Sequence, residues 1–106
     1  MKSGDEVIST PMTAEPTNTS ILYTGAKVVW SDVDPKTGNM CPDSVEKLIS
    51  KRTKAILCVH YAGYPADIVK LREIADKLVS NFAKFHYICR IACIMNTKNS
   101  FSSFRN

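Results

Sequence analysis

The sequence lacks several features that would assign it directly to a common class of protein. No run approaches the roughly 20 apolar residues that a membrane-spanning helix needs, and residues 1–6 contain no apolar core of a signal peptide. The glycines stand singly rather than in a phosphate-binding loop, and no Ser-His-Asp arrangement with a nucleophile turn is recognisable. We therefore expect a cytoplasmic chain without a membrane segment.

Acidic residues are missing from the last part of the chain. The 106 residues carry a net charge of +4, and the last of the ten acids is Asp76. Residues 1–76 hold nine Lys and Arg, whereas residues 77–106 hold five and also all four Phe. This change in composition predicts an α/β body over 1–80 and a divergent basic tail over 81–106. The basic residues of the tail are spread singly, so they do not indicate a nucleic-acid surface.

Cysteine is present, but its pattern does not indicate a disulfide framework or a metal site. Four cysteines in a chain without an export signal are expected to be reduced thiols. Cys89 and Cys93, with His86 nearby, would share one face of a helix. Zinc needs four ligands, usually with tighter cysteine spacing, and the isoleucines around this pair are typical of a core. We expect no metal site.

Strand-like and helix-like segments alternate through the body. Apolar residues make up 44% of the chain and charged residues 23%, which is typical of a globular protein. The expected strands are 6–10, 27–33 and 53–60, and the expected helices are 14–24, 42–49 and 66–78. This order predicts an α/β fold with a partial parallel sheet and flanking helices. In the tail, residues 85–95 alternate with period two and predict a strand, with a helix as the open alternative.

Several short segments occur in an order that is typical of one family. They are Gly4–Ile8, Pro11–Thr13, Ile21–Ala26, Asp32–Pro35 with Thr37 and Asn39, Thr53–Ile56, Val59–Gly63, Pro65–Asp67 and Ile74–Asp76. From Gly4 to about Leu78 the chain resembles the DegT/DnrJ/StrS-type sugar aminotransferases, which depend on pyridoxal 5'-phosphate (PLP). The resemblance implies a slice of the large domain of the aspartate-aminotransferase fold, fold type I. It also implies an intact relative that moves an amino group from glutamate to a nucleotide-linked keto sugar.

The resemblance also shows which catalytic parts have no counterpart in this sequence. In the family, the phosphate-binding turn lies before the segment that corresponds to Gly4–Ile8. An acid that keeps the pyridine nitrogen protonated lies in the strand after the last expected helix, where this chain has Val79–Lys84 instead. The Schiff-base lysine comes later still. Lys54 and Lys70 are not at its position, and we expect both to be solvated. We therefore expect a truncated, inactive fragment that does not retain PLP, for which a frameshift or gene remnant is one explanation.

Four residues remain as candidates for contact with a cofactor. Thr13 could donate a hydrogen bond to a ligand, although a helix-capping role is the stronger expectation. Ala14 occupies the position at which the family has an aromatic residue that stacks on the PLP ring. His60 and Tyr61 end a buried strand at the carboxyl edge of the sheet, where they could line a site. For His60 the favoured alternative is an imidazole that is satisfied by the backbone.

A second hypothesis is a non-catalytic α/β module. In this case the apolar tail strand would dock at an exposed sheet edge of a partner. The expected partner is a second copy of the chain or a larger aminotransferase chain. We do not expect binding to a membrane or to nucleic acid.

Overall fold

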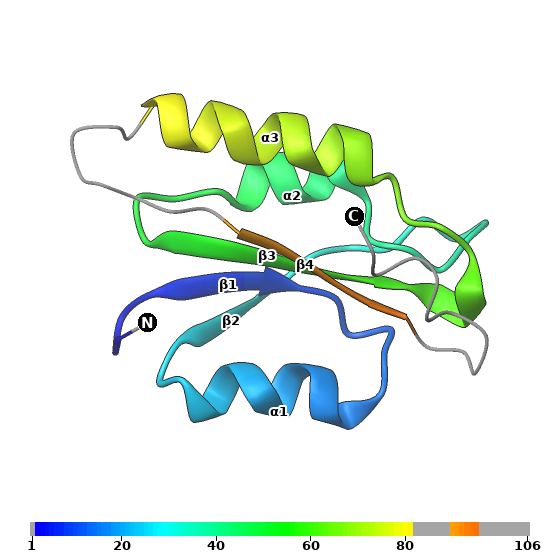
Figure 1. The fold of residues 1–106 in the computed structure, drawn as a ribbon, viewed down its shortest axis with the longest axis horizontal. Coiled ribbons are helices and arrows are strands. Elements are labelled where there is room, and N and C mark those ends of the chain that lie inside the picture. Colours follow the sequence, from blue (N-terminus) through cyan, green and yellow to red (C-terminus); the bar gives the residue numbers. More distant parts are fainter. Residues whose placement is uncertain (1, 82–89, 96–106) are drawn as a thin grey trace.

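The computed structural model describes residues 2–81 and 90–95 as one α/β layer structure (Figure 1). Within these residues, four strands alternate with three α-helices, and a short 3₁₀ turn, η1, follows the third strand. The strands are β1 (Glu6–Ser9), β2 (Lys27–Trp30), β3 (Thr53–His60) and β4 (Arg90–Met95). The helices are α1 (Glu15–Tyr23), α2 (Pro42–Leu48) and α3 (Ile68–Asn81), and η1 is Tyr61–Gly63.

The strands form a parallel sheet in the order β2-β1-β3-β4. The chain passes from β1 through α1 to β2 on one side, and then crosses back through α2 to β3 on the other side of β1. Figure 1 shows α1 on one face of the sheet, and α2 and α3 on the opposite face. The expected α/β fold class with a parallel sheet is therefore confirmed.

The core consists of two apolar clusters, one on each face of the sheet. Successive strand residues point to opposite faces, so Val7 packs on the α1 side whereas Ile8 packs on the side of α2 and α3. Ile56, the residue paired with Ile8, is fully buried on the same side as Leu71 of α3. Residues 55–59 of β3 are all buried, which agrees with a strand that is covered on both faces.

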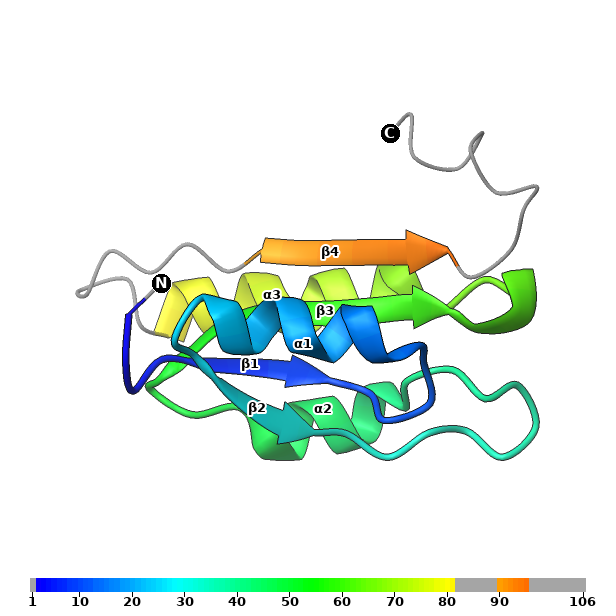
Figure 2. The same cartoon turned by 90° about the horizontal axis from the view of Figure 1, so that it is seen from below.

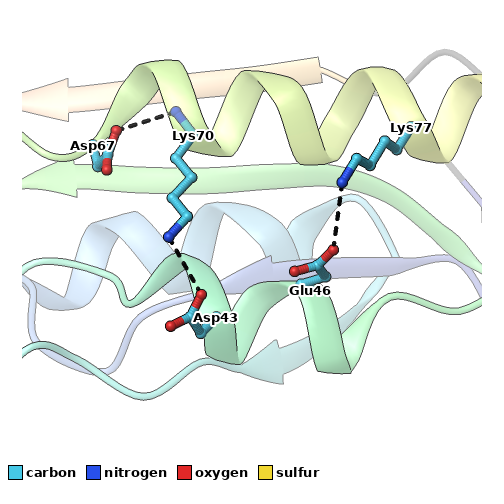
Figure 3. A network of polar contacts seen from close by, with 5 residues as sticks. All are labelled: Asp43, Glu46, Asp67, Lys70 and Lys77. Carbon is cyan, nitrogen blue, oxygen red and sulfur yellow. Dashed lines mark hydrogen bonds and ion pairs between the residues drawn. The ribbon is translucent and has the colours of Figure 1, made fainter.

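Helix α3 is held to the sheet mainly by its apolar stripe. Leu71, Ile74 and Ala75 recur at helical spacing and are buried in the larger cluster. Two ion pairs also connect α3 with α2, Lys70–Asp43 at 3.5 Å and Lys77–Glu46 at 3.9 Å (Figure 3). The side chains of both pairs are more than half exposed, so each contributes less than about 1 kcal/mol.

The largest differences between the observed and the expected element boundaries are at the ends of β2 and α3, whereas the other ends differ by at most two residues. β2 ends at Trp30 instead of Val33, because Val33 forms an isolated antiparallel bridge with Met40 that closes the intervening turn. Helix α3 continues to Asn81, so residues 79–81 are helical and do not begin the next strand. β4 is the next described strand and pairs with β3 from Ala55–Arg90 to His60–Met95.

The expected tail strand over 85–95 is present in its second half, at 90–95, whereas 85–89 lie outside the described residues. Of the three residues considered as metal ligands, Cys89 and His86 lie there as well, whereas Cys93 belongs to β4. Among the described residues no cluster of three or more potential metal ligands occurs. No described helix is long and apolar enough to cross a membrane.

Candidate functional site

The candidate site lies at the carboxyl edge of the sheet, between β1 and β3. The loop after β1 leads to α1 on one face, whereas the loop after β3 leads to α3 on the other face. Loops that leave neighbouring parallel strands in opposite directions open a crevice between them, which is the usual ligand position in open α/β sheets. The four residues proposed from the sequence flank this point, Thr13 and Ala14 after β1, and His60 and Tyr61 at the end of β3.

A hydrogen-bonded cluster fixes the loop after β1. The Ser9 hydroxyl donates to Asn18 Oδ1 at 2.6 Å, and Asn18 Nδ2 donates to the Thr10 carbonyl oxygen at 3.0 Å. The Thr10 hydroxyl oxygen accepts from the Met12 N–H at 3.2 Å. Asn18 lies on α1, so the loop is tied to the helix that follows it. The β1 side of the crevice is therefore held by side chains as well as by the strand.

Thr13 does not cap α1, which corrects the stronger of its two expected roles. The N-cap residue is Ala14, in an extended conformation with φ −66° and ψ 147°, and no side chain caps the helix. The Thr13 hydroxyl lies 3.0 Å from the Thr17 hydroxyl instead, one turn into the helix. Pro16 in the first turn has no N–H to satisfy, which reduces the need for a cap. Ala14 is exposed, and its methyl group offers no ring for stacking.

His60 is buried and engaged by the backbone. Its side chain is 8% exposed, and Nδ1 accepts a hydrogen bond from the Ala66 N–H at 2.8 Å. This contact is the one expected if a backbone group satisfies the imidazole. Because Nδ1 is the acceptor, the neutral imidazole carries its proton on Nε2. His60 thus holds the start of the segment that leads to α3, and only Nε2 remains for another partner.

Asn39 organises the loop that carries Tyr61, a role that the local sequence does not indicate. Its Oδ1 accepts from the Tyr61 N–H at 2.8 Å, and its Nδ2 donates to the carbonyl oxygens of Tyr64 at 3.0 Å and Pro65 at 3.1 Å. Asn39 is 5% exposed. The sequence places it in a turn and in the family pattern but does not indicate these contacts, because its partners are 22 to 26 positions away.

Gly38 brings the same turn against the Tyr61 ring. It has φ +75°, and a Cβ placed there would lie 2.6 Å from Tyr61 Cδ1. Both the backbone conformation and the close approach of the ring therefore require glycine. Ala62, next to Tyr61, also has a positive φ of 51°. The 34–39 turn and the loop after β3 form one interlocked unit, which sets the position of Tyr61.

The described residues do not fit a site that anchors PLP covalently. Lys54 begins β3 at the amino edge, opposite the crevice, and the Lys70 ammonium group pairs with Asp43. Among the described loops at the carboxyl edge, the single lysine is Lys36, which is exposed in the 34–39 turn. The sequence contains no acid after Asp76, so β4 carries none that could face a pyridine nitrogen. The described residues at the carboxyl edge therefore form one wall of a crevice.

A parallel sheet of this order, with loops that diverge between β1 and β3, is an open, doubly wound α/β architecture, the class of fold in which ligands usually bind outside the carboxyl ends of the strands. The family model of the DegT/DnrJ/EryC1/StrS aminotransferase family matches residues 1–79. The chain belongs to this family.

Individual relatives agree with this assignment. An uncharacterised protein of Methanocaldococcus jannaschii is 43% identical over 75 residues, which are 71% of this chain and 19% of that protein. The sugar aminotransferase CalS13 from Micromonospora echinospora is 39% identical with a TM-score of 0.73, over 82% of this chain and 23% of that one. The putative sugar aminotransferase Spr1654 from Streptococcus pneumoniae, in its PLP form, is 28% identical with a TM-score of 0.74, over 86% of this chain and 25% of that one.

The chain covers only part of each of these relatives. It spans about a fifth to a quarter of the length of the relatives that it matches. The superposition on CalS13 covers 82% of 106 residues, which is more than the 79 residues that the family model matches. The fold is a slice of the fold type I large domain.

Proposed function

We propose that this sequence is part of the large domain of a PLP-dependent nucleotide-sugar aminotransferase and forms one wall of its cofactor crevice. The observation that supports this proposal is the family match combined with the placement of Thr13, Ala14, His60 and Tyr61 around one crevice at the carboxyl edge. In the intact relatives the reaction would transfer an amino group from glutamate to a keto sugar, with PLP as the cofactor.

We propose further that a polypeptide of this sequence alone does not transaminate. A transaminase needs a lysine for the Schiff base, an acid near the pyridine nitrogen and donors for the phosphate. Residues 1–80 supply a wall without these parts, and residues 81–106 contain no acid. Ala14 also removes a stacking contact that is worth on the order of 1 kcal/mol. The division into a body over 1–80 and a tail over 81–106 belongs to this proposal, as does a cytoplasmic location.

Incubation with PLP tests the proposal. We expect no absorbance of an internal aldimine, and after borohydride reduction no stoichiometric PLP adduct at a single lysine. A full-length sugar aminotransferase serves as the positive control. Hydrogen-exchange protection of residues 55–59 shows in the same sample that the sheet is folded. A stoichiometric adduct at one lysine, together with amino transfer from glutamate to a sugar, would refute the inactive state.

The second candidate function, a module that associates with a larger aminotransferase chain, is favoured by the position of β4. Among the described strands β4 pairs only with β3, so its other edge is open to a further strand. Stable, stoichiometric association with a full-length relative would support this function. Failure of the two proteins to associate at any mixing ratio would exclude it.

A further inference from the structure

Two cysteines that are distant in the sequence are register partners in the sheet. Cys58 lies in β3 and Cys93 lies in β4, and the parallel pairing of these strands sets the two residues directly opposite each other. Figure 2 shows the two strands side by side, with β4 at the margin of the sheet. Neighbouring strands lie about 4.8 Å apart, and a disulfide joins residues whose Cα atoms are about 4.4–6.8 Å apart. The register therefore places this pair within the range of a disulfide.

The pair belongs to the face of the sheet that α2 and α3 cover. Cys58 is fully buried there, in the same apolar cluster as Ile56 and Leu71. Register partners share one face of a sheet, so Cys93 lies on this face as well. Among the described strands β4 pairs only with β3, so it can separate from β3 without disrupting the other strand pairs. Local opening of this kind gives a small oxidant access to Cys58.

We propose that Cys58 and Cys93 form a reversible disulfide when the chain meets glutathione disulfide. One protein thiolate attacks a sulfur atom of glutathione disulfide and expels a glutathione thiolate. The other protein thiolate then attacks the protein sulfur of this mixed disulfide and expels the second glutathione. The two protein thiols lose two electrons and two protons, and the two glutathione thiols gain them. The link joins the tail strand to the body, whether or not the chain transaminates.

The geometry of the sheet predicts that this link is easily reduced. The Cβ atoms of a disulfide lie about 3.5–4.5 Å apart, which is less than the usual separation of about 4.8 Å between strands. The two strands must therefore approach each other slightly, and strained disulfides have more oxidising potentials than structural ones. In a reducing compartment both residues remain thiols, and the link forms only when the glutathione pool becomes oxidised.

Disulfide mapping tests the pairing. The full chain is incubated with glutathione disulfide, the remaining thiols are alkylated, and trypsin then places each of the four cysteines on a different peptide. We expect residues 55–70 to be joined to residues 91–98, and dithiothreitol to separate them. Oxidation in concentrated urea is the control. Without the sheet, closure of a short loop favours Cys89 with Cys93, so the yield of the 55–70 to 91–98 link should fall about tenfold.

Substitutions test the consequence for stability. Oxidation should raise the thermal unfolding midpoint of the wild type by roughly 10 °C, because the link closes a long loop of the unfolded chain. Cys58→Ala and Cys93→Ala should each abolish the linked peptides and this shift. Cys41→Ala is the matched control and should leave both unchanged, since Cys41 is half-buried and precedes α2. Each shift is measured against the reduced form of the same variant, which separates the link from the effect of the substitution itself.

Three results would overturn the proposal. The first is a chain that remains folded by circular dichroism and keeps both thiols reduced in excess glutathione disulfide. The second is a folded chain in which the main link joins Cys93 to Cys89 or to Cys41. The third is a link between Cys58 and Cys93 that forms as readily in urea as in the folded chain. None of these results affects the PLP experiment, so the proposed function is tested separately.

Discussion

Asn39→Ala would remove the three hydrogen bonds that hold the loop after β3, and its cost can be worked out from the structure. The substitution leaves the Tyr61 N–H and the carbonyl oxygens of Tyr64 and Pro65 without their partner beside a side chain that is 5% exposed. Each net hydrogen bond contributes about 1 kcal/mol, and a buried group left unsatisfied costs about 1–3 kcal/mol. Partial entry of water reduces the sum, so we expect a loss of about 2–4 kcal/mol.

A loss of this size is large for a small domain. Domains of this kind are stable by about 5–15 kcal/mol, and each kcal/mol corresponds to roughly 4–8 °C in the unfolding midpoint. We therefore expect the Asn39→Ala midpoint to fall by about 10 °C or more. Urea unfolding followed by far-UV circular dichroism measures the free energy directly, and an unchanged m-value would show that the denatured state is unaffected.

A graded series separates the specific contacts from a general effect of the substitution. Asn18→Ala removes two hydrogen bonds from a half-buried side chain and should cost less than Asn39→Ala. Asn39→Asp keeps one acceptor but loses both donors and places a carboxylate against two carbonyl oxygens, so it should be at least as damaging at pH 7. Lowering the pH should partly restore this variant, because the native state then favours the protonated carboxyl group. An Asn39→Ala protein within 0.5 kcal/mol of wild type, a threshold set by the usual ~0.5 kcal/mol scatter of surface substitutions, would refute the reasoning.

Two further substitutions test the packing around the site and the core. Gly38→Ala should destabilise the fold by about 1–3 kcal/mol, because the new Cβ would lie 2.6 Å from the Tyr61 ring at a φ of +75°. Thermal unfolding measures this loss. An unchanged unfolding midpoint would mean that the turn and the ring can separate without cost. Leu71→Ala should lower the free energy of unfolding by about 2–5 kcal/mol, because Leu71 is fully buried between α3 and the sheet. Urea denaturation measures this loss. A loss smaller than that of the exposed control Val69→Ala would contradict the assigned core.

How much of the fold could be predicted depends on the range of the interactions involved. The strands of the body and the stripe of α3 follow from local periodicity, which neighbouring residues determine. The end of α1 follows in the same way, since Gly25 with φ +84° comes two residues after Tyr23. The end of β2 was wrong by three residues, because the bridge from Val33 to Met40 competes with continuation of the strand.

The candidate site was predictable in position but not in its contacts. His60 and Tyr61 lie at the strand end where the sequence places them, since strand length is a local property. Thr13 was assigned a capping role from its residue type, but the hydroxyl of Thr17 is its partner. The choice between such partners depends on side-chain geometry, which residue type does not fix.

The sequence by itself determined the class of fold and the family, because alternating periodicities and the order of short segments are written along the chain. Tertiary structure alone decided the strand order, the place of β4 beside β3 and the role of Asn39 between two loops. It also decided that Cys58 and Cys93 are register partners on adjacent strands. These features arise from contacts between segments that are distant in sequence, and the local pattern of residues does not indicate such contacts.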